Sequence, residues 1–203
     1  MSNPRVLVTQ PAPDFTCAAV GPEGNIVESL RFSEFSEGRV TALVFYPLDF
    51  TFVCPSELIA LDHRMETLRE RSVEVLAVSI DSQFTHAAWR KTKIEDGGIG
   101  PVRYTMAADV KHEICQAYGV EHGDGVALRA TFLIDDKGIV RAQLVNDLPL
   151  GRNMDELLRL VDALAFHEEH GEVCPAGWQR GRAGMDASTD GVARYLAKHA
   201  TQL

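Results

Sequence analysis

Two nearly continuous apolar runs, each followed by a helical pattern, constrain the fold of this chain more than any other feature. Residues 39–46 (RVTALVFY) and 73–80 (VEVLAVSI) are typical of strands buried on both faces of a sheet. Between them, residues 55–71 carry apolar side chains at three- and four-residue intervals, which predicts an amphipathic helix. A second helix is predicted over residues 82–93. Strands that alternate with helices indicate an α/β fold.

The rest of the chain extends this pattern. Residues 104–109 and 111–118 predict another strand and helix, and residues 153–167 predict a third long helix. Residues 129–135 and 139–145 flank the turn Asp136-Lys137-Gly138, and the turn residues 21–25 (GPEGN) predict an N-terminal hairpin. Since hairpins are antiparallel, the central sheet should be mixed.

The composition changes at about Glu168. Five helix-breaking residues precede a last predicted helix over residues 189–199: Gly171, Pro175, Gly177, Gly181 and Gly184. This segment is too small to fold alone. We therefore expect one domain over residues 1–167 and a C-terminal arm over residues 168–203.

Charge and hydropathy exclude several classes of function. The net charge of −9 over 203 residues, without a basic run, argues against nucleic-acid binding. No apolar stretch is long enough to cross a bilayer, and residues 1–10 lack an export signal, so we expect a cytoplasmic protein. There is no phosphate loop or Gly-x-Gly-x-x-Gly motif, and no cluster completes His167 and His170 as metal ligands. We expect neither cofactor nor metal.

Cys54 stands in the loop that follows the first buried strand, within residues 47–55 (PLDFTFVCP). Ligand sites of α/β sheets lie at the carboxyl ends of strands, where this loop begins. Proline is tolerated in the first helical turn, so Pro55 predicts that Cys54 lies at a helix N-terminus. The unpaired N–H groups there stabilise a thiolate by about 0.3–2 kcal/mol, and we expect an arginine to add positive charge.

The loop also carries the spacing Pro47-x-x-x-Thr51-x-x-Cys54. This spacing resembles the peroxidatic motif of the peroxiredoxins. Residues 55–57 (PSE) and 173–178 (VCPAGW) resemble the typical two-cysteine group, which includes the bacterial alkyl hydroperoxide reductase C proteins. The resemblance covers nearly the whole chain. It implies a thioredoxin-like α/β sandwich with a mixed central sheet, an N-terminal hairpin and a C-terminal arm.

The resemblance implies a role for each residue of the site. Cys54 would attack the terminal oxygen of a hydroperoxide and become a sulfenic acid. Thr51 would aim its hydroxyl at the thiolate and the peroxide, and Pro47 would shield the site from water. Arg129 would stabilise the thiolate and the charge that spreads over the breaking O–O bond, and Glu57 would orient Arg129.

Cys174 corresponds in this resemblance to the resolving cysteine of the family. It would come from the other subunit of a homodimer, and such dimers commonly assemble into a ring. Hydrogen peroxide and organic hydroperoxides would be the substrates, in antioxidant defence. Thioredoxin or a flavoprotein disulfide reductase would re-reduce the disulfide between Cys54 and Cys174.

Two other interpretations stay open at this point. The chain could be a redox-regulated chaperone or peroxide sensor, in which oxidation of Cys54 changes assembly. It could also be an inactive thioredoxin-like interaction protein. The joint presence of Pro47, Thr51, Cys54 and Arg129 disfavours the second of these.

Several residues outside the motif also carry expectations. Cys17 and Cys115 match no catalytic position and should be structural, and Phe84 and Trp89 should be packing residues. In the resembling family, a Gly-Gly-Leu-Gly loop and a Tyr-Phe pair accompany sensitivity to over-oxidation. Here the loop reads GGIG over residues 97–100 and the pair reads Tyr195-Leu196, which predicts intermediate sensitivity.

Overall fold

The computed structural model describes residues 6–203 in two compact units, which divide between Met154 and Asp155. The second unit therefore holds almost all of helix α6 (Met154–His170), and the change in composition at Glu168 lies inside it. Residues 1–5, part of the segment for which we predicted no export signal, lie outside the described residues.

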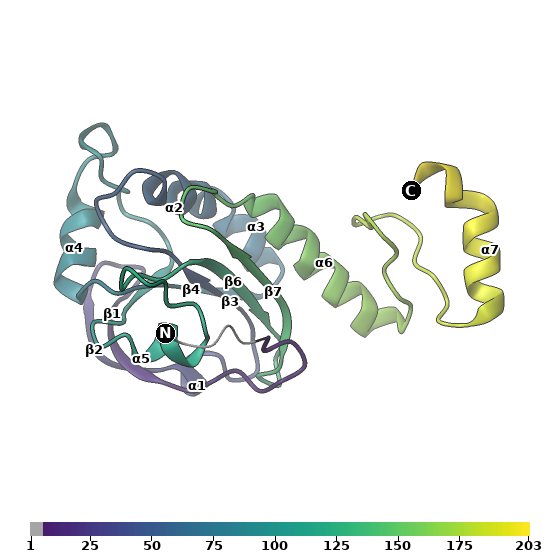
Figure 1. Cartoon of the computed structure of the whole chain (residues 1–203), viewed down its shortest axis with the longest axis horizontal. Coiled ribbons are helices and arrows are strands. Elements are labelled where there is room, and N and C mark those ends of the chain that lie inside the picture. Colours follow the sequence, from purple (N-terminus) through teal and green to yellow (C-terminus); the bar gives the residue numbers. More distant parts are fainter. Residues whose placement is uncertain (1–5) are drawn as a thin grey trace. The chain divides into compact units, whose positions relative to one another are not determined.

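Among the described residues, a mixed sheet of seven strands forms the centre of the first unit (Figure 1). Only β4 pairs in parallel with both of its neighbours, β3 and β5, while the outer pairs are antiparallel. The predicted mixed sheet is confirmed, with both hairpins. In spatial order, the strands are β2 (Ile26–Arg31), β1 (Thr16–Val20), β5 (Thr105–Ala108), β4 (Val73–Ser79), β3 (Val40–Phe45), β6 (Arg129–Ile134) and β7 (Val140–Asn146).

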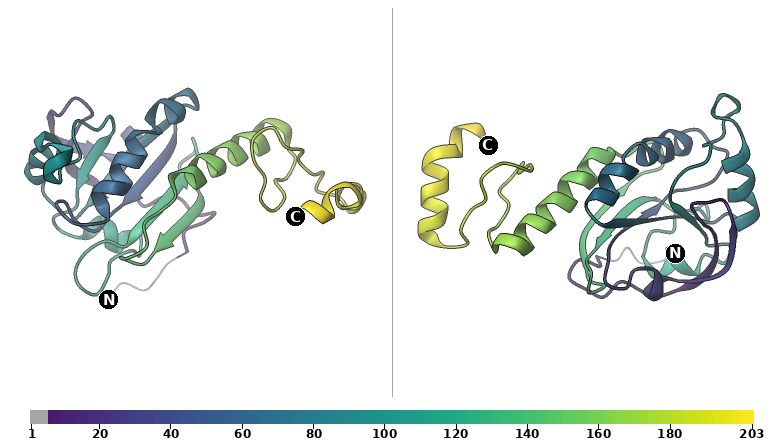
Figure 2. Two further views of the ribbon diagram at one scale, coloured as in Figure 1. Left: turned by 90° about the horizontal axis from the view of Figure 1, so that it is seen from above. Right: turned by 180° about the vertical axis from the view of Figure 1, so that it is seen from behind.

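Helices cover both faces of this sheet. Leu43 and Phe45 of β3 share a buried core with Tyr118, which directly follows α5 (Glu113–Ala117). Because successive residues of a strand point to opposite faces, the equally buried Ala42 and Val44 face the other side. Helices α2 (Cys54–Asp62) and α3 (Met65–Glu70) lie on that side (Figures 1 and 2). The short helix α1 (Phe32–Phe35) follows β2.

Residues 55–71 form α2 and α3 rather than the single helix that we predicted. The backbone N–H of Arg64 donates to the carbonyl of Leu61, three residues back, and this interrupts the α-helical hydrogen-bond pattern. The prediction of one continuous helix is therefore wrong. The predicted apolar face is confirmed, since its four members are buried: Leu58, Leu61, Met65 and Leu68.

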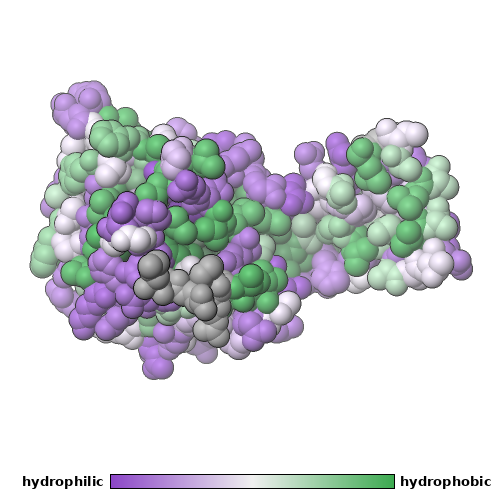
Figure 3. All heavy atoms as spheres, in the orientation of Figure 1, coloured by the Kyte–Doolittle hydropathy of each residue, from purple (hydrophilic) through white to green (hydrophobic). Residues whose placement is uncertain are grey.

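The predicted helix after β4 is α4 (Gln83–Lys91), which is followed by the short η1 (Ile94–Asp96). The hydroxyl of Ser82 accepts a hydrogen bond from the N–H of Thr85 and so caps α4. Trp89 is fully buried, as a packing residue should be, whereas Phe84 is 63% exposed and does not pack inside this chain. The buried face of α4 carries His86, Trp89 and Arg90, and Phe84 lies off this face. Apolar residues reach the surface in this region of Figure 3.

The second unit is built on α6. After this helix, Val173 and Met185 exchange two backbone hydrogen bonds, and the ring of Trp178 packs 4.8 Å from that of Phe166. Helix α7 spans Thr189–His199, as predicted, and η2 spans Ala200–Gln202. Within residues 6–203, no helix has both the length and the apolar character needed to cross a membrane.

Candidate active site

Cys54 is the first residue of α2, and Pro55 occupies the first turn behind it. The side chain of Cys54 is fully buried. The loop over residues 46–53 starts at the carboxyl end of β3, because β3 ends at Phe45. The sequence therefore predicted the position of Cys54 correctly, at a helix N-terminus beside the end of a buried strand.

Arg129 lies beside this cysteine because β6 runs antiparallel to β3. Ala130 pairs with Phe45, so Arg129, the first residue of β6, meets the end of β3 where the loop begins. Its Nη1 atom donates to Cys54 Sγ at 3.4 Å and to Glu57 Oε2 at 2.7 Å. Its Nε atom donates to the carbonyl of Leu148 at 2.6 Å. The structure thus places Arg129, Cys54 and Glu57 in direct contact.

Arg152 is the residue of this site that our reading of the sequence missed. Its backbone N and Nε atoms lie 2.7 and 2.8 Å from Glu57 Oε1, and its Nη2 atom lies 3.1 Å from Oε2. Its Nη1 atom donates to the carbonyl of Ala130 at 2.7 Å. Arg152 stands in a loop without a local motif. The only signal was indirect, since a buried carboxylate needs more donors than Arg129 provides.

Hydrogen bonds and charges in this cluster favour the ionised forms of Glu57 and Arg129. Burial alone would raise the pKa of Glu57, but the hydrogen bonds and charge of Arg152, with the charge of Arg129, outweigh it and lower that pKa. Burial would lower the pKa of Arg129, but Cys54 and Glu57 together raise it. Glu57 and Arg129 therefore stay charged although both are buried, and the guanidinium of Arg129 faces the sulfur of Cys54.

Thr51 and Pro47 complete the loop. Pro47 is buried, whereas Thr51 is only partly buried. The hydroxyl of Thr51 donates to the carbonyl of Leu48 at 2.9 Å. Because this bond uses the only proton of the hydroxyl, Thr51 Oγ1 can accept a hydrogen bond from a hydroperoxide O–H but does not donate one here. We expected a hydroxyl aimed at the thiolate, and its recorded hydrogen bond goes to Leu48.

A second set of polar side chains, all buried except the partly exposed Asp81, holds the other side of the loop. We call Tyr46, Asp49, Ser79, Asp81 and His86 the Asp49 network. Asp49 Oδ1 accepts from the Tyr46 hydroxyl at 2.7 Å, and Asp49 Oδ2 lies 2.8 Å from His86 Nδ1. The N–H of Asp49 donates to Asp81 Oδ2 at 2.8 Å, and the Ser79 hydroxyl donates to the same oxygen at 2.7 Å.

The hydrogen bonds of His86 determine how many protons this network holds. His86 Nε2 lies 3.1 Å from the carbonyl of Ala107, which only accepts, so Nε2 carries a proton. A second proton must lie between His86 Nδ1 and Asp49 Oδ2. Burial raises the pKa of Asp49, against the opposing influence of His86. The pair of His86 and Asp49 is therefore neutral as a whole and joins the loop to α4.

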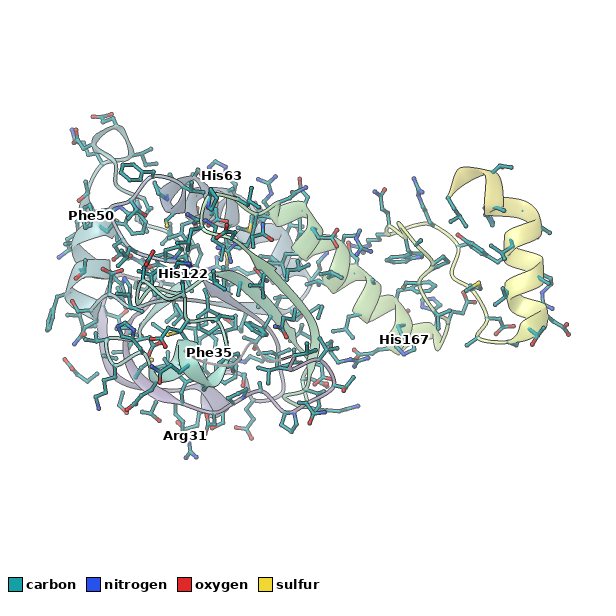
Figure 4. All side chains as sticks on the ribbon, in the orientation of Figure 1. Arg31, Phe35, Phe50, His63, His122 and His167 are labelled. Atoms are coloured by element: carbon teal, nitrogen blue, oxygen red, sulfur yellow. The ribbon has the colours of Figure 1, made fainter. Side chains whose placement is uncertain are left out.

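An aromatic contact also joins the loop to α4. The ring of Phe50, labelled in Figure 4, packs 5.7 Å from that of Trp89.

Cys174 lies in the second unit and is partly buried. Its thiol donates to the carbonyl of Ala163 at 3.4 Å. Burial raises the pKa of Cys174, although the positive charge of Arg159 opposes this effect. Arg159 Nη1 also donates to the carbonyl of Trp178 at 3.3 Å, so it ties the segment around Cys174 to α6. All four cysteines of the chain are free thiols.

The remaining thiols lie in environments that suppress their reactivity. Burial raises the pKa of Cys17 to about 11. Burial, together with the negative charge of Asp109, also raises the pKa of Cys115. Cys115, His112 and Glu121 bring three possible metal ligands within 4.8 Å of one another. These groups already bond among themselves, since His112 Nδ1 lies 2.9 Å from Glu121 Oε1 and Cys115 donates to the carbonyl of His112.

Known proteins are similar to this chain in sequence and in fold. The sequence profile of the AhpC/TSA family matches residues 8–143, and that of the C-terminal domain of 1-Cys peroxiredoxin matches residues 163–198. Alkyl hydroperoxide reductase C of Buchnera aphidicola subsp. Schizaphis graminum is 50% identical over 194 residues, which are 95% of this chain and 98% of the relative. The chain belongs to the typical two-cysteine peroxiredoxins.

Solved structures of peroxiredoxins superpose closely on this chain. The reduced 2-Cys peroxiredoxin of Plasmodium vivax superposes with a TM-score of 0.92 at 46% identity, over 95% of this chain and 100% of that one. Plasmodium yoelii Prx1a, which forms an artifactual octamer when modified at the N-terminus, superposes with a TM-score of 0.75 at 49% identity, over 84% of this chain and 98% of that one. The predicted thioredoxin-like fold is confirmed. The protein is a thiol peroxidase that reduces peroxides, as the sequence predicted.

Proposed function

We propose that Cys54 is the peroxidatic cysteine and that Cys174 of the partner subunit resolves its oxidised form. The 3.4 Å contact between Arg129 Nη1 and Cys54 Sγ supports this assignment most directly. A thiolate attacks the terminal oxygen of a hydroperoxide, the O–O bond breaks, and the released alkoxide or hydroxide takes up a proton. Cys54 is left as a sulfenic acid, which the second thiol converts into a disulfide with loss of water.

The other residues of the site assist the first of these steps. Arg129 would stabilise the thiolate and the negative charge that develops on the leaving oxygen. Glu57 would orient Arg129, and Arg152 would in turn fix Glu57, so both are positioning residues. Thr51 Oγ1 would accept a hydrogen bond from the O–H of the bound hydroperoxide, because its own proton is donated to the carbonyl of Leu48. Pro47 would keep water from the sulfur, as its burial supports.

The second step needs Cys174 to leave its present contacts. We propose that the Gly- and Pro-rich arm over residues 168–203 moves as the mobile appendage of a peroxidase domain over residues 1–167. The contacts that hold the arm to α6 include a hydrogen bond from the Cys174 thiol to the carbonyl of Ala163, one from Arg159 to the carbonyl of Trp178, and the packing of the Trp178 ring on Phe166. These few interactions are weak enough for local opening to compete with turnover.

We further propose a cytoplasmic homodimer that assembles into a ring of dimers, without nucleic-acid or membrane partners. Three exposed aromatic side chains on the loop and α4 support burial in an interface between dimers: Phe50, Phe52 and Phe84, at 51%, 96% and 63% exposure. Thioredoxin or a flavoprotein disulfide reductase would reduce the disulfide, in antioxidant defence against hydrogen peroxide and organic hydroperoxides.

Cysteine variants test the assignment. Cys54→Ser should abolish peroxide reduction, whereas Cys174→Ser should consume about one peroxide per subunit and then stall. Cys17→Ser is the matched control and should turn over like the unmodified protein. On non-reducing gels, peroxide should produce a disulfide-linked dimer in which peptide mapping joins Cys54 to Cys174. A bridge within one chain, or full turnover by Cys174→Ser, would show that the division of roles is wrong.

A further inference from the structure

A pocket of about 510 Å³ lies where the β1–β2 turn, α3, α4 and the segment before β5 meet. Four cationic side chains line it: Arg69, Arg90, Lys91 and Arg103. Among the described residues of the lining, Glu23 alone is acidic. The whole chain carries a net charge of −9, so this excess of cations is local. None of the residues around Cys54 lines this pocket.

Arg90 is a buried cation without a directly paired carboxylate among the described residues, and Asp62 and Glu23 act on its charge only through longer-range attraction. Arg90 is only 6% exposed, and its guanidinium forms no ion pair within residues 6–203. Nη1 donates to the carbonyl of Tyr104 at 3.1 Å and Nη2 to that of Pro22 at 2.6 Å. These carbonyls fix the guanidinium in place but carry no negative charge. Burial accordingly lowers the pKa of Arg90, and an anion in the pocket would relieve this cost.

The other cations leave an excess of positive charge that matches a dianion. Arg103 Nε pairs with Asp62 Oδ1 at 3.3 Å, and Arg69 donates to the carbonyl of Arg103 at 2.8 Å. Lys91 is exposed, and no ion pair of residues 6–203 includes it. After Glu23 and Asp62 are counted against the four cations, two positive charges remain.

We propose that this pocket binds the phosphate group of a small phosphomonoester, with Arg90 as its buried anchor. A phosphomonoester carries a charge of about −1.5 to −2 at neutral pH, and guanidinium groups recognise its oxygens in pairs. The volume exceeds that of a bare phosphate, and Pro22, Ala87 and Pro101 provide apolar walls for an organic group. The pocket is a second site on this peroxiredoxin, separate from the peroxide chemistry.

Calorimetric titration of the reduced full-length protein tests the proposal, with inorganic phosphate, phenyl phosphate and benzoate at constant ionic strength. Phenyl phosphate should bind saturably with a Kd below about 1 mM. Arg90→Gln should weaken it at least about tenfold, which corresponds to about 1.4 kcal/mol. The double variant Arg69→Gln with Lys91→Gln should weaken it severalfold. Arg31→Gln removes one charge from a remote exposed position and should not change the affinity.

Three results would overturn the site. They are the absence of saturable binding below about 10 mM, benzoate bound as tightly as phenyl phosphate, and a folded Arg90→Gln variant with unchanged affinity. If Arg90→Gln does not fold, the double variant of the exposed Arg69 and Lys91 decides the matter, and unchanged affinity there would equally reject the site. Inorganic phosphate that binds as tightly as phenyl phosphate would support the site and identify free phosphate as its ligand.

Discussion

Arg129 reaches Cys54 through a single guanidinium nitrogen, Nη1, which lies 3.4 Å from the sulfur. The same nitrogen lies 2.7 Å from Glu57 Oε2. One donor atom therefore contacts both the sulfur of Cys54 and the carboxylate of Glu57, which fixes the guanidinium. Nε is bound to the carbonyl of Leu148 at 2.6 Å, so the guanidinium is anchored on two sides. A site with such fixed geometry can stabilise developing charge without reorganising.

Arg129→Met should slow the reaction of Cys54 with peroxide at least about a hundredfold, or about 2.7 kcal/mol. It should also leave less thiolate at neutral pH, because the positive charge beside the sulfur is lost. Pre-steady-state kinetics and thiolate absorbance measure the two effects. Arg39→Met removes an exposed arginine paired with Glu74 and serves as the control. An unchanged rate together with unchanged thiolate absorbance would remove Arg129 from the chemistry.

The stability of the protein should depend on pH through Glu57. Its pKa is lowered in the folded state, so the arginines stabilise the fold while the carboxylate is ionised. This contribution is complete above the ordinary value of 4.5 and is lost as the pH falls through the lower pKa of the folded state. Glu57→Gln should lower the free energy of unfolding by about 3 kcal/mol at neutral pH, because it removes one partner of a buried ion pair.

Urea unfolding at several pH values measures this dependence. The difference in the free energy of unfolding between the unmodified protein and Glu57→Gln should be constant above about pH 6 and shrink below the ordinary pKa of 4.5. Glu28→Gln changes an exposed carboxylate and should leave the stability within about 0.5 kcal/mol. A difference that stays constant down to acid pH would mean that ionised Glu57 does not stabilise the fold.

The Asp49 network should position the peroxidatic loop. In His86→Leu, Asp49 loses the 2.8 Å contact to Nδ1, and a buried carboxylate is left without its compensating proton. The peroxide step should slow about tenfold or more, a loss of about 1.4 kcal/mol or more. His86→Gln keeps an N–H group for Asp49 and should recover part of the rate. Stopped-flow measurement of both variants tests this, and equal rates in the two would reject the role of the hydrogen bond.

Over-oxidation should be intermediate and should respond to Leu196. Leu196 stands where the family's Tyr-Phe pair has phenylalanine, and it is 42% exposed on α7. Leu196→Phe should restore about 1 kcal/mol of packing, so that the site opens less readily. The sulfenic acid of Cys54 would then react more often with a second peroxide before the resolving thiol arrives. Mass spectrometry of Cys54 after graded peroxide with a recycling reductant should then detect more sulfinic acid. Equal amounts in both proteins would contradict the packing explanation.

Local sequence rules located much of the catalytic loop. The buried run before Cys54 and Pro55 after it placed the cysteine at the start of α2. The helix over residues 189–199 agrees with α7 residue for residue. These predictions succeeded because strand periodicity, proline geometry and capping depend on residues that are close together in the chain.

Other features depended on tertiary contacts that local sequence patterns do not report. Glu57 and Arg152 are 95 residues apart, and only the packed fold brings the guanidinium to the carboxylate. Whether the exposed Phe84 is covered by another subunit is not a property of its own helix. His86 and Asp49 likewise meet across 37 residues. The sequence by itself determined the order of elements and placed Cys54 at the start of a helix, where the family resemblance predicts the reacting thiol. The tertiary structure decided which distant charges surround that thiol, because their pairing is favourable only after folding excludes water from both partners.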